Sequence, residues 1–385
     1  MYLDFNATSP LSQSVQNWLK SGEFHFANPS SQHSAGKASR KVINESREKI
    51  FKVFHKNEKD TRLFFHSGAT EGISTIAHSF AEEARLCGRD LLICYSKIDH
   101  PAVNSLEENY LGPHVKFYEM KRGQDLFYSQ EENYKAILDK KENNPDLIIL
   151  VHHLWVHNET GHLSPLADLA LLKKIPDLYV HVDAVQAPGK VETWRELTHG
   201  DIFTFSAHKF GALKGIGFSF LPKNLPLHPL LTGGGQQSNL RSGTENPMGV
   251  QSIALALDDL VKVDVKKLAS LRERLVKEFS QRLQGIGEVI TASPDKMNAN
   301  TIYFYLSKLT SDVSLALFDL NGMMISAGSA CQSGAAKDSE ILLHLHKGNS
   351  AKNGLRLSFG FSFSEEDLNI LNQKLDPIFN KLRAL

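Results

Sequence analysis

One cysteine of this chain lies in a segment that has nothing to bury it. Cys331 stands in ISAGSACQSGAAKDS, residues 325–339, where Ser, Gly and Ala flank it on both sides. Such small residues cover little apolar surface, so the segment predicts an exposed, flexible loop. A thiol in that setting becomes a nucleophile once it ionises. Cys331 is therefore the candidate reactive cysteine.

The two remaining cysteines have a different setting. Cys94 lies in LLICYS, which predicts a buried strand, and Cys87 follows AEEARL and precedes Gly88, as at a helix end. We interpret both as small core hydrophobes. Three cysteines without a CxxC pair argue against a disulfide framework and are typical of a reducing cytoplasm.

Two segments follow predicted strands. One could bind a phosphate, and the other could form a covalent bond with a carbonyl. In SGATEG, residues 67–72, small residues stand at a predicted helix start, so backbone N–H groups can approach an anion. The Thr70 hydroxyl would also favour binding of a phosphate. A plain helix cap is the alternative interpretation. In SAHKFGALKGIG, residues 206–217, Lys209 has Ser206 and His208 beside it and suits a Schiff-base lysine. A solvated loop lysine is the alternative, and Lys214 is the rival amine.

Three more groups stand in or just after predicted strands. Asp183 in YVHVDAVQA needs a cation, such as the ring nitrogen of pyridoxal phosphate, unless it caps a helix. His100 in KIDHPAVN could stack on a flat ring or move protons, or be a turn histidine satisfied by the next helix. Arg356 in NGLRLSFG suits a substrate carboxylate, with a structural ion pair as the alternative.

The elements that must position these groups alternate along the chain. Short apolar runs such as TRLFFHS, DLLICYS, DLIILVHHLW, LYVHVDA and DIFTFSA are separated by helical stretches, which predicts an α/β domain with a parallel sheet covered on both faces. Ligands of such sheets bind at the carboxyl ends of the strands. A helical pattern covers residues 246–283. The strands NTIYFYLS, MMISAGS and GLRLSFG, with the helix DVSLALFDLN, then predict a smaller α+β domain.

The predicted domain boundary lies near residue 258. The large domain would comprise residues 13–258, and the small one residues 1–12 and 259–385, with the cysteine loop at about 326–340. The chain closes on a predicted helix with Ser364 as its N-cap and an apolar stripe formed by Leu368, Leu371, Leu375, Ile378 and Leu382.

Composition excludes little but narrows the function classes. The 385 residues carry 43 basic and 43 acidic side chains without a block of like charge, so no bulk footprint for nucleic acid or an anionic membrane is visible. The opening MYLDFNATSP has no secretory pattern, and runs such as LIILV are too short to span a bilayer. His152, His153 and His157 lack matching ligand spacing apart from Glu159, so no metal site is expected.

Ten motifs occur in an order that resembles a known family, the cysteine desulfurases of the class V aminotransferase fold. They are YLDFNAT, NPSSQHSAGK, SGATEG, DHPAV, HNETG, HVDAVQAPGK, SAHKFGALKGIG, GGGQQSNLRSGTEN, SAGSACQSG and LRLSFG. The cysteine motif is similar to that of the long-loop housekeeping and nitrogen-fixation group. The resemblance implies the pyridoxal phosphate-dependent transferase fold type I, with a mostly parallel seven-stranded sheet in the large domain, and a cytoplasmic homodimer.

The resemblance also implies roles for individual residues. Lys209 would hold pyridoxal phosphate covalently and move the substrate's Cα proton, and His100 would stack on the ring. Asp183 would pair with the ring nitrogen and Gln186 would contact the ring oxygen. The remaining implied contacts are the phosphate ligands Ala69, Thr70, Ser206 and His208, the neighbouring subunit's phosphate ligand Thr244, the substrate carboxylate ligands Asn158 and Arg356, and the entrance-loop residues Asn28, Pro29, Ser30 and His33.

The implied reaction converts L-cysteine to L-alanine and leaves a persulfide on Cys331, which a sulfur-acceptor protein would collect for iron–sulfur cluster or thiolation pathways. The alternatives are a selenocysteine lyase or another class V enzyme, and a catalytically decayed interaction protein. Three features depart from the usual family pattern: His157 stands where asparagine is usual, Asp99 stands where a glutamate commonly precedes the histidine, and we expect no scaffold-docking C-terminal extension. The resemblance therefore does not extend to the scaffold partner.

Overall fold

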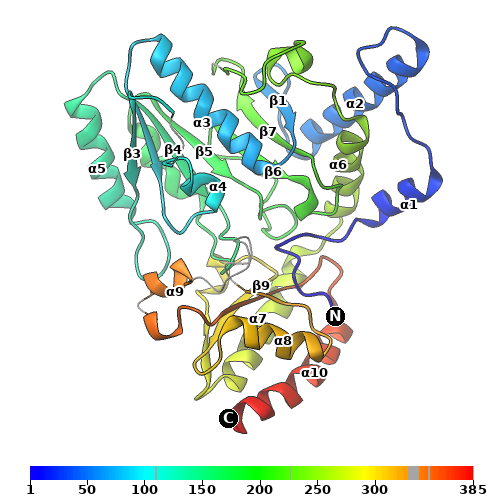
Figure 1. Cartoon of the computed structure of the whole chain (residues 1–385), viewed down its shortest axis with the longest axis vertical. Helices are drawn as coiled ribbons and strands as arrows, with labels where there is room; N and C mark the ends of the chain where they lie inside the picture. The colour runs from blue at the N-terminus through cyan, green and yellow to red at the C-terminus, as the bar shows by residue number, and fades with distance from the viewer. Residues whose placement is uncertain (109–110, 226, 328–337, 346, 385) are drawn as a thin grey trace.

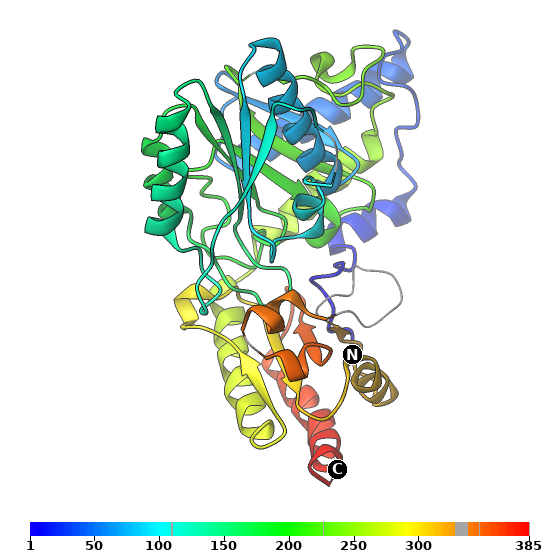
Figure 2. The same cartoon turned by 60° about the vertical axis from the view of Figure 1, so that its left-hand side comes forward.

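The computed structural model describes residues 1–108, 111–225, 227–327, 338–345 and 347–384. Figure 1 shows a large sheet flanked by helices above a smaller sheet with its own helices, and the N-terminal segment reaches the smaller part; Figure 2 shows the same two parts from the side. No helix among these residues is long and apolar enough to cross a membrane.

The large sheet has seven strands in the order β1-β7-β6-β5-β4-β2-β3. Only β7 runs against its neighbours, so the predicted mostly parallel seven-stranded sheet is confirmed. Its strands are β1 (Thr61–His66), β2 (Leu91–Tyr95), β3 (Val115–Glu119), β4 (Ile148–Leu154), β5 (Leu178–Asp183), β6 (Ile202–Ser206) and β7 (Gly217–Pro222).

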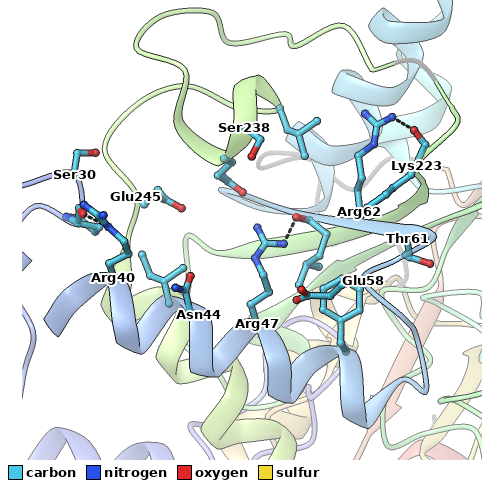
Figure 3. A pocket seen from close by; sticks show the side chains of 16 residues that line it. Ser30, Arg40, Asn44, Arg47, Glu58, Thr61, Arg62, Lys223, Ser238 and Glu245 are labelled. Carbon is cyan, nitrogen blue, oxygen red and sulfur yellow. Dashed lines mark hydrogen bonds between the residues drawn. The ribbon is translucent and has the colours of Figure 1, made fainter. Parts of the chain in front are cut away.

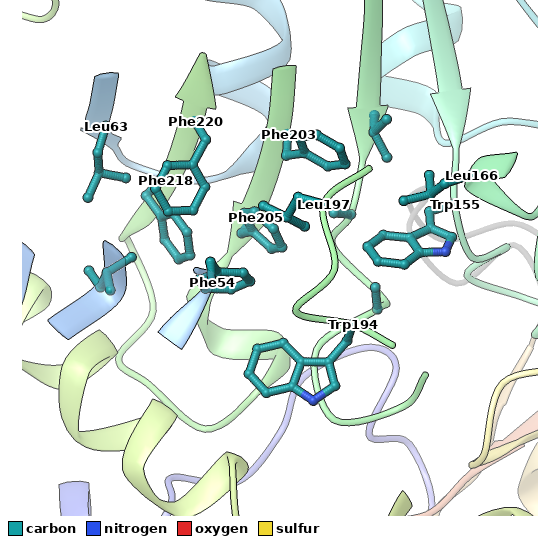
Figure 4. Packing of buried hydrophobic residues seen from close by; sticks show 14 of the residues in the cluster. Phe54, Leu63, Trp155, Leu166, Trp194, Leu197, Phe203, Phe205, Phe218 and Phe220 are labelled. Atoms are coloured by element: carbon teal, nitrogen blue, oxygen red, sulfur yellow. The ribbon is translucent and has the colours of Figure 1, made fainter. Parts of the chain in front are cut away.

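Helices cover both faces of this sheet. One face packs on α1 (Gln13–Ser21), α2 (Ser34–Val53), α5 (Gln130–Asn143) and α6 (Pro247–Leu260), around the aromatic cluster in Figure 4. The other face packs on α3 (Ala69–Leu86) and α4 (Pro101–Asn104). Because side chains alternate along a strand, Phe203 and Phe205 of β6 enter the aromatic cluster while Thr204 lies on the α3 face.

The smaller part is built on a four-stranded antiparallel sheet in the order β10-β11-β9-β8. Leu3 of the N-terminal segment joins its core. The predicted stripe of the last helix is confirmed, since all five of its residues are buried, and Ser364 caps that helix by accepting from Asp367 N. The elements are β8 (Gly287–Ile290), β9 (Thr301–Leu306), β10 (Ser326–Ala327), β11 (Gly354–Ser358), α7 (Val265–Arg282), α8 (Ser311–Leu320), α9 (Glu340–His344) and α10 (Glu365–Ala384).

Two sequence-based expectations need correction. The single helical pattern over residues 246–283 is two helices, because α6 ends at Leu260 and the Asp264 side chain starts α7 by accepting from Lys267 N. Cys87 is exposed rather than a core residue, since the turn after α3 leaves its thiol against the exposed Glu83 side of the helix; Cys94 is buried in β2 as predicted. The domain boundary near residue 258 stays a prediction.

Candidate active site

A pocket of about 410 Å³ lies at the carboxyl ends of the large sheet's strands. Ten of the sequence-predicted residues line it, and they come from the ends of β4, β5 and β6, the start of α3, the turn before α4, and β11 of the small sheet. They are Ala69, Thr70, His100, Asn158, Asp183, Gln186, Ser206, His208, Lys209 and Arg356. The pocket also takes in Asn6 and Ala7, which the sequence reasoning missed.

The start of α3 forms one wall with open backbone donors. Its cap residue Gly68 provides no side-chain cap, and a Cβ built there would have only Ser206 Oγ within 4.0 Å. The first N–H groups of a helix have no partner inside the helix and carry positive partial charge. This wall can bind a phosphate at Ala69 and Thr70, as the sequence predicts.

Glu71 organises the same turn from behind. Its carboxylate accepts from Ser67 N at 2.8 Å and from Arg241 Nε at 2.9 Å. Burial raises the pKa of Glu71, but these hydrogen bonds outweigh burial and lower it to about 2. Glu71 is thus ionised and paired, which fixes the backbone of the phosphate wall.

Lys209 carries the reactive amine that the motif predicts. Its Nζ donates to the carbonyl oxygens of Asn6 at 2.8 Å and Ala7 at 2.9 Å, so the N-terminal segment holds the amine at the pocket. Neighbouring His208 bonds Thr8 Oγ1 through Nδ1 at 3.1 Å. Burial and the Lys209 charge lower the pKa of His208 to about 4, so this imidazole is neutral.

Asp183 is a buried carboxyl at the end of β5, 7% exposed, with no ion pair among the described residues. Its Oδ1 accepts from Val185 N at 3.0 Å, so the helix-cap alternative is partly realised as a turn contact. Burial raises the pKa of Asp183 to about 6, although Val185 N–H and Lys209 oppose this. A cationic ring nitrogen in the pocket would supply the missing partner.

His100 both lines the pocket and caps α4. Its Nδ1 accepts from Ala102 N at 3.1 Å, so its neutral ring carries the proton on Nε2. Burial, then the Lys209 charge, lower the pKa of His100 to about 4. His100 therefore both caps the helix, as the turn-histidine alternative predicts, and lines the pocket.

The residue before His100 fixes this turn. Asp99 is buried and pairs with Arg122 Nη2 at 2.7 Å, and Tyr128 Oη donates to the same carboxylate at 3.2 Å. Tyr128 Oη in turn accepts from Leu154 N at 3.2 Å, and the Arg122 guanidinium lies 3.6 Å from the Tyr128 ring centre. Asp99 thus ties the His100 turn to the end of β4.

Arg356 of β11 brings the small sheet to the pocket. Its Nη2 pairs with Asp4 at 2.7 Å and its Nη1 donates to the Asn158 carbonyl at 3.0 Å, while its buried Nε has no partner among the described residues. The structural ion pair considered as an alternative is therefore present. The orphaned Nε–H is one of the donors left for a substrate carboxylate.

His157, one of the departures expected from the sequence, does not line the pocket. Its Nε2 bonds the Ile98 carbonyl at 2.8 Å and its Nδ1 accepts from Glu159 N at 3.2 Å. Burial lowers the pKa of His157 to about 3, so the ring is neutral and links the Asn158 turn to the segment that carries His100. Beside it, burial raises the pKa of Glu159 to about 7 against the opposing charge of Arg356.

A buried polar row beneath the pocket was not foreseen. Across β1, β7, β6, β5 and β4, the row joins His66 to Ser219 (3.0 Å), Ser219 to Thr204 (2.8 Å), Thr204 to His181 (2.7 Å) and His181 to His152 (2.9 Å). Each of these residues faces α3. The only signal in the sequence was a polar residue two positions before the strand-end residues Asp183, Ser206 and Leu154.

Some predicted site residues lie elsewhere. Thr244 is exposed and does not line the pocket, and Cys331 lies outside the described residues. Pro29 and Ser30 line a second hollow of about 670 Å³ beside α2, whose walls carry Arg40 and Arg47 (Figure 3), and His33 caps α2. None of the four entrance-loop residues lines the candidate pocket.

The histidine-rich segment of β4 holds no metal-like arrangement in the described part of the chain, where no group of three His, Cys, Asp or Glu could bind a metal ion. His152 bonds His181, and His153 Nε2 bonds the Ser164 carbonyl at 3.2 Å.

Residues 1–371 match the family model for aminotransferase class V. This chain belongs to that family. It is 31% identical over 395 residues to the cysteine desulfurase IscS of Dictyoglomus turgidum, covering 100% of this chain and 96% of the relative. It is also 31% identical to a cysteine desulfurase of Cereibacter sphaeroides, covering 100% and 97%. A solved NifS-like protein aligns with a TM-score of 0.85 at 27% identity, covering 100% of both chains.

The class V family depends on pyridoxal phosphate, and the residues present fit that group. The pocket offers the amine of Lys209, the Asp183 carboxylate without an ion pair, and the uncapped start of α3. The predicted fold type and the predicted relationship to cysteine desulfurases are confirmed.

Proposed function

We propose that this protein uses pyridoxal phosphate bound at Lys209 to convert L-cysteine to L-alanine and a persulfide on Cys331. One observation supports the proposal above all: three groups meet in one pocket. They are the amine of Lys209, the Asp183 carboxyl without a cation, and Arg356 with an unused donor. The first two suit a pyridine aldehyde, and the third suits the carboxylate of an amino acid.

Different pocket residues would contact different parts of the cofactor. Ala69, Thr70, Ser206 and His208 would bind its phosphate, Asp183 its ring nitrogen, Gln186 its ring oxygen and His100 its ring face. The cofactor, when bound, supplies an electron sink for bonds at the amino acid's Cα and Cβ. Asp183 tunes that sink because its buried negative charge stabilises a protonated ring nitrogen.

The chain's own groups would handle the substrate and its protons. Arg356 Nε and the Asn158 side chain would bind the carboxylate, which places the Cα–H bond beside Lys209. Lys209 Nζ would take and return that proton, and the two backbone carbonyls that hold the amine would orient it. The neutral His100 can donate a hydrogen bond from Nε2 into the pocket without adding charge.

Sulfur would leave through Cys331. Its thiolate attacks the substrate's Sγ, a new S–S bond forms, and the Cβ–Sγ bond breaks. The electron pair of that bond stays on Cβ, which takes a proton to become the methyl group of alanine. Atoms and electrons balance without an outside oxidant, and an acceptor protein would then collect the sulfur. Since a nucleophilic thiol stays reduced in the cytoplasm, we place the protein there.

Thr244 would act in a homodimer. It is exposed and lies apart from the pocket of its own chain, so a phosphate role requires the site of a second copy. In size-exclusion chromatography with light scattering we expect a dimer. Mixing inactive Thr244→Ala and Lys209→Ala subunits should restore activity, because each heterodimer then contains one site with both residues. No restored activity in confirmed heterodimers would contradict this role.

The experiment that tests the function loads the protein with pyridoxal phosphate, adds L-cysteine and measures alanine. We expect a visible absorbance band that is absent in Lys209→Ala, and alanine formed in step with sulfide in the presence of a thiol. Alanine with selenocysteine alone would identify a selenocysteine lyase instead. A bound cofactor without alanine from either substrate would overturn the proposal and indicate a non-catalytic protein.

A further inference from the structure

A lysine that the reaction does not use lies buried beside the cofactor pocket. Lys190 is 1% exposed, and its Nζ donates to Asn6 Oδ1 at 3.0 Å and to Gln186 Oε1. Its backbone is fixed on both sides, because Lys190 N donates to the Ala187 carbonyl and the Lys190 carbonyl accepts from Ala299 N at 2.8 Å. The amine thus bridges two amide oxygens, and its residue lies at the junction with the small sheet.

The contacts indicate an uncharged amine. Lys190 has no ion pair among the described residues, and its two hydrogen-bond acceptors match the two N–H groups of a neutral amine. Burial, then the charges of Lys209 and Arg356, lower the pKa of Lys190 well below its ordinary value. A third proton would find no acceptor in the part of the chain that the structure describes, which also argues for the neutral form.

Two contacts set which way the Gln186 amide faces. Lys190 Nζ donates to Gln186 Oε1, so the Gln186 amide nitrogen points the other way. That nitrogen donates one hydrogen to the Asn6 carbonyl at 2.9 Å, and its second hydrogen is left for the pocket that Gln186 lines. Lys190 also holds Asn6 through Oδ1, so both contacts that orient the amide weaken without Lys190.

We infer that Lys190 is a positioning residue for the cofactor: its amine fixes the Gln186 amide so that a hydrogen-bond donor, not an acceptor, faces the cofactor's ring oxygen. The same amine holds Asn6, whose carbonyl accepts from Lys209 Nζ. One buried lysine thus orders the donor to the ring oxygen and one of the two acceptors of the reactive amine. This inference rests on the proposed function.

The test measures the pH at which the visible band of bound pyridoxal phosphate titrates. A donor to the ring oxygen stabilises its negative charge and so lowers this midpoint. In Lys190→Met the Gln186 donor is no longer fixed, and we expect the midpoint to rise by roughly one pH unit, the scale of one hydrogen bond to a charged group. Lys190→Arg keeps N–H donors and adds a permanent positive charge, so its midpoint should stay or fall.

A double-mutant comparison separates orientation from charge. Gln186→Met should raise the midpoint as Lys190→Met does, and the double variant should add nothing further if Lys190 acts through Gln186. An additive rise, or an unchanged midpoint in folded Lys190→Met, would overturn the inference. If Lys190→Met does not fold, Lys190→Gln, whose donor is one bond shorter, should show the same rise.

Two controls complete the design. Lys141 is also buried, donates to the Leu147 carbonyl at 2.8 Å and does not line the pocket, so Lys141→Met should leave the midpoint unchanged. A wild-type protein that shows no Lys209-dependent band would contradict the proposed function itself, and this outcome is distinct from every result expected of the Lys190 variants.

Discussion

At the scale of single residues, the pocket is marked by groups that lack partners. The Asp183 carboxyl has no cation and Arg356 Nε has no acceptor in the described residues, although both lie in buried surroundings. A buried acid without a cation and a buried donor without an acceptor both destabilise a fold, so their meeting in one pocket favours a ligand that supplies both partners. The ligand that fits is an amino acid carboxylate together with a cationic ring.

Arg356→Lys tests the carboxylate role. Lysine keeps the charge but loses the planar set of donors, so the hydrogen bond from Nε to the substrate disappears. We expect KM for L-cysteine to rise roughly 10- to 100-fold, the equivalent of about 1.5–3 kcal/mol for a hydrogen bond to a charged group, with a smaller effect on kcat. Steady-state alanine formation measures both constants.

The matched control is Arg274→Lys, which changes an exposed arginine of α7 that pairs with Glu365 and does not line the pocket. It should leave KM unchanged. A KM for Arg356→Lys equal to that of the wild type would remove Arg356 from the substrate site.

The residues that the sequence could predict are those at strand ends. Because the carboxyl ends of parallel strands meet at one edge, Asp183 and Ser206 could be placed together from the strand pattern alone. Lys190 and Asn6 could not, since a lysine in APGK resembles a solvated loop residue and the N-terminal segment carries no periodic pattern. Their burial results from tertiary contacts with Gln186 and the small sheet.

At the scale of elements, α3 couples the phosphate wall to the polar row beneath it. A Cβ on Gly72 would lie 2.7 Å from His66 Nε2 and 2.9 Å from Thr204 Cγ2. Gly72 therefore allows the first turn of α3 to sit directly on the sheet. The helix in turn covers the row, whose imidazoles and hydroxyls bond one another across the strands.

Gly72→Ala should push the first turn of α3 away from the sheet. The added methyl must displace His66 or Thr204, so we expect a loss of about 1–3 kcal/mol in the free energy of unfolding and weaker cofactor binding. Chemical denaturation and a cofactor titration measure the two effects. Gly348→Ala, where an added Cβ meets nothing within 4 Å, should change neither; equal stability of Gly72→Ala and the wild type would argue that α3 can shift freely.

Element prediction failed where tertiary contacts override local pattern. The pattern over residues 246–283 is helical throughout, yet α6 packs on the large sheet and α7 on the small one, and the chain turns between them at residues 261–264. The short strands β3 and β8 were not predicted either, because half-buried edge strands carry a weak apolar pattern. The buried strands β1, β2, β4, β5 and β6 were predicted from short apolar runs and α10 from its apolar stripe, whereas the buried strand β7 was not predicted.

At the scale of the whole molecule, the pocket joins the two sheets through the N-terminal segment. Asp4 bridges to Ser358 of β11, while the carbonyl of Asn6 receives Lys209 and its side chain bonds Thr301 of β9. In the proposed reaction, a substrate held by Arg356 and processed by Lys209 would depend on the fixed placement of the large and small sheets.

Buried neutral histidines should make the fold sensitive to acid. Burial lowers the pKa of His152, His153 and His157 to about 3 and that of His66 to about 4. The unfolded chain binds protons at these groups below about pH 6.5, whereas the folded chain does not, so stability falls as the pH drops below about 6.5. Asp183 and Glu159, whose pKa values are raised to about 6 and 7, act in the opposite direction but are fewer.

We therefore expect the free energy of unfolding to fall between about pH 6.5 and 5 by more than about 1.4 kcal/mol per pH unit, the effect of one net titrating group. Urea denaturation at several pH values measures this slope. His55→Asn changes an exposed histidine with a left-handed backbone (φ 52°) that asparagine tolerates, and it should keep the slope. A stability that is flat over this range would contradict the neutral buried histidines.

The decisive experiment measures alanine release from L-cysteine by the protein loaded with pyridoxal phosphate, with Lys209→Ala and Cys331→Ala beside it. We expect continuing alanine formation by the wild type, none by Lys209→Ala, and almost none by Cys331→Ala, although Cys331→Ala still binds the cofactor. Equal alanine release by the wild type and Cys331→Ala would contradict the persulfide route, and no alanine from a cofactor-bound wild type would contradict the desulfurase activity.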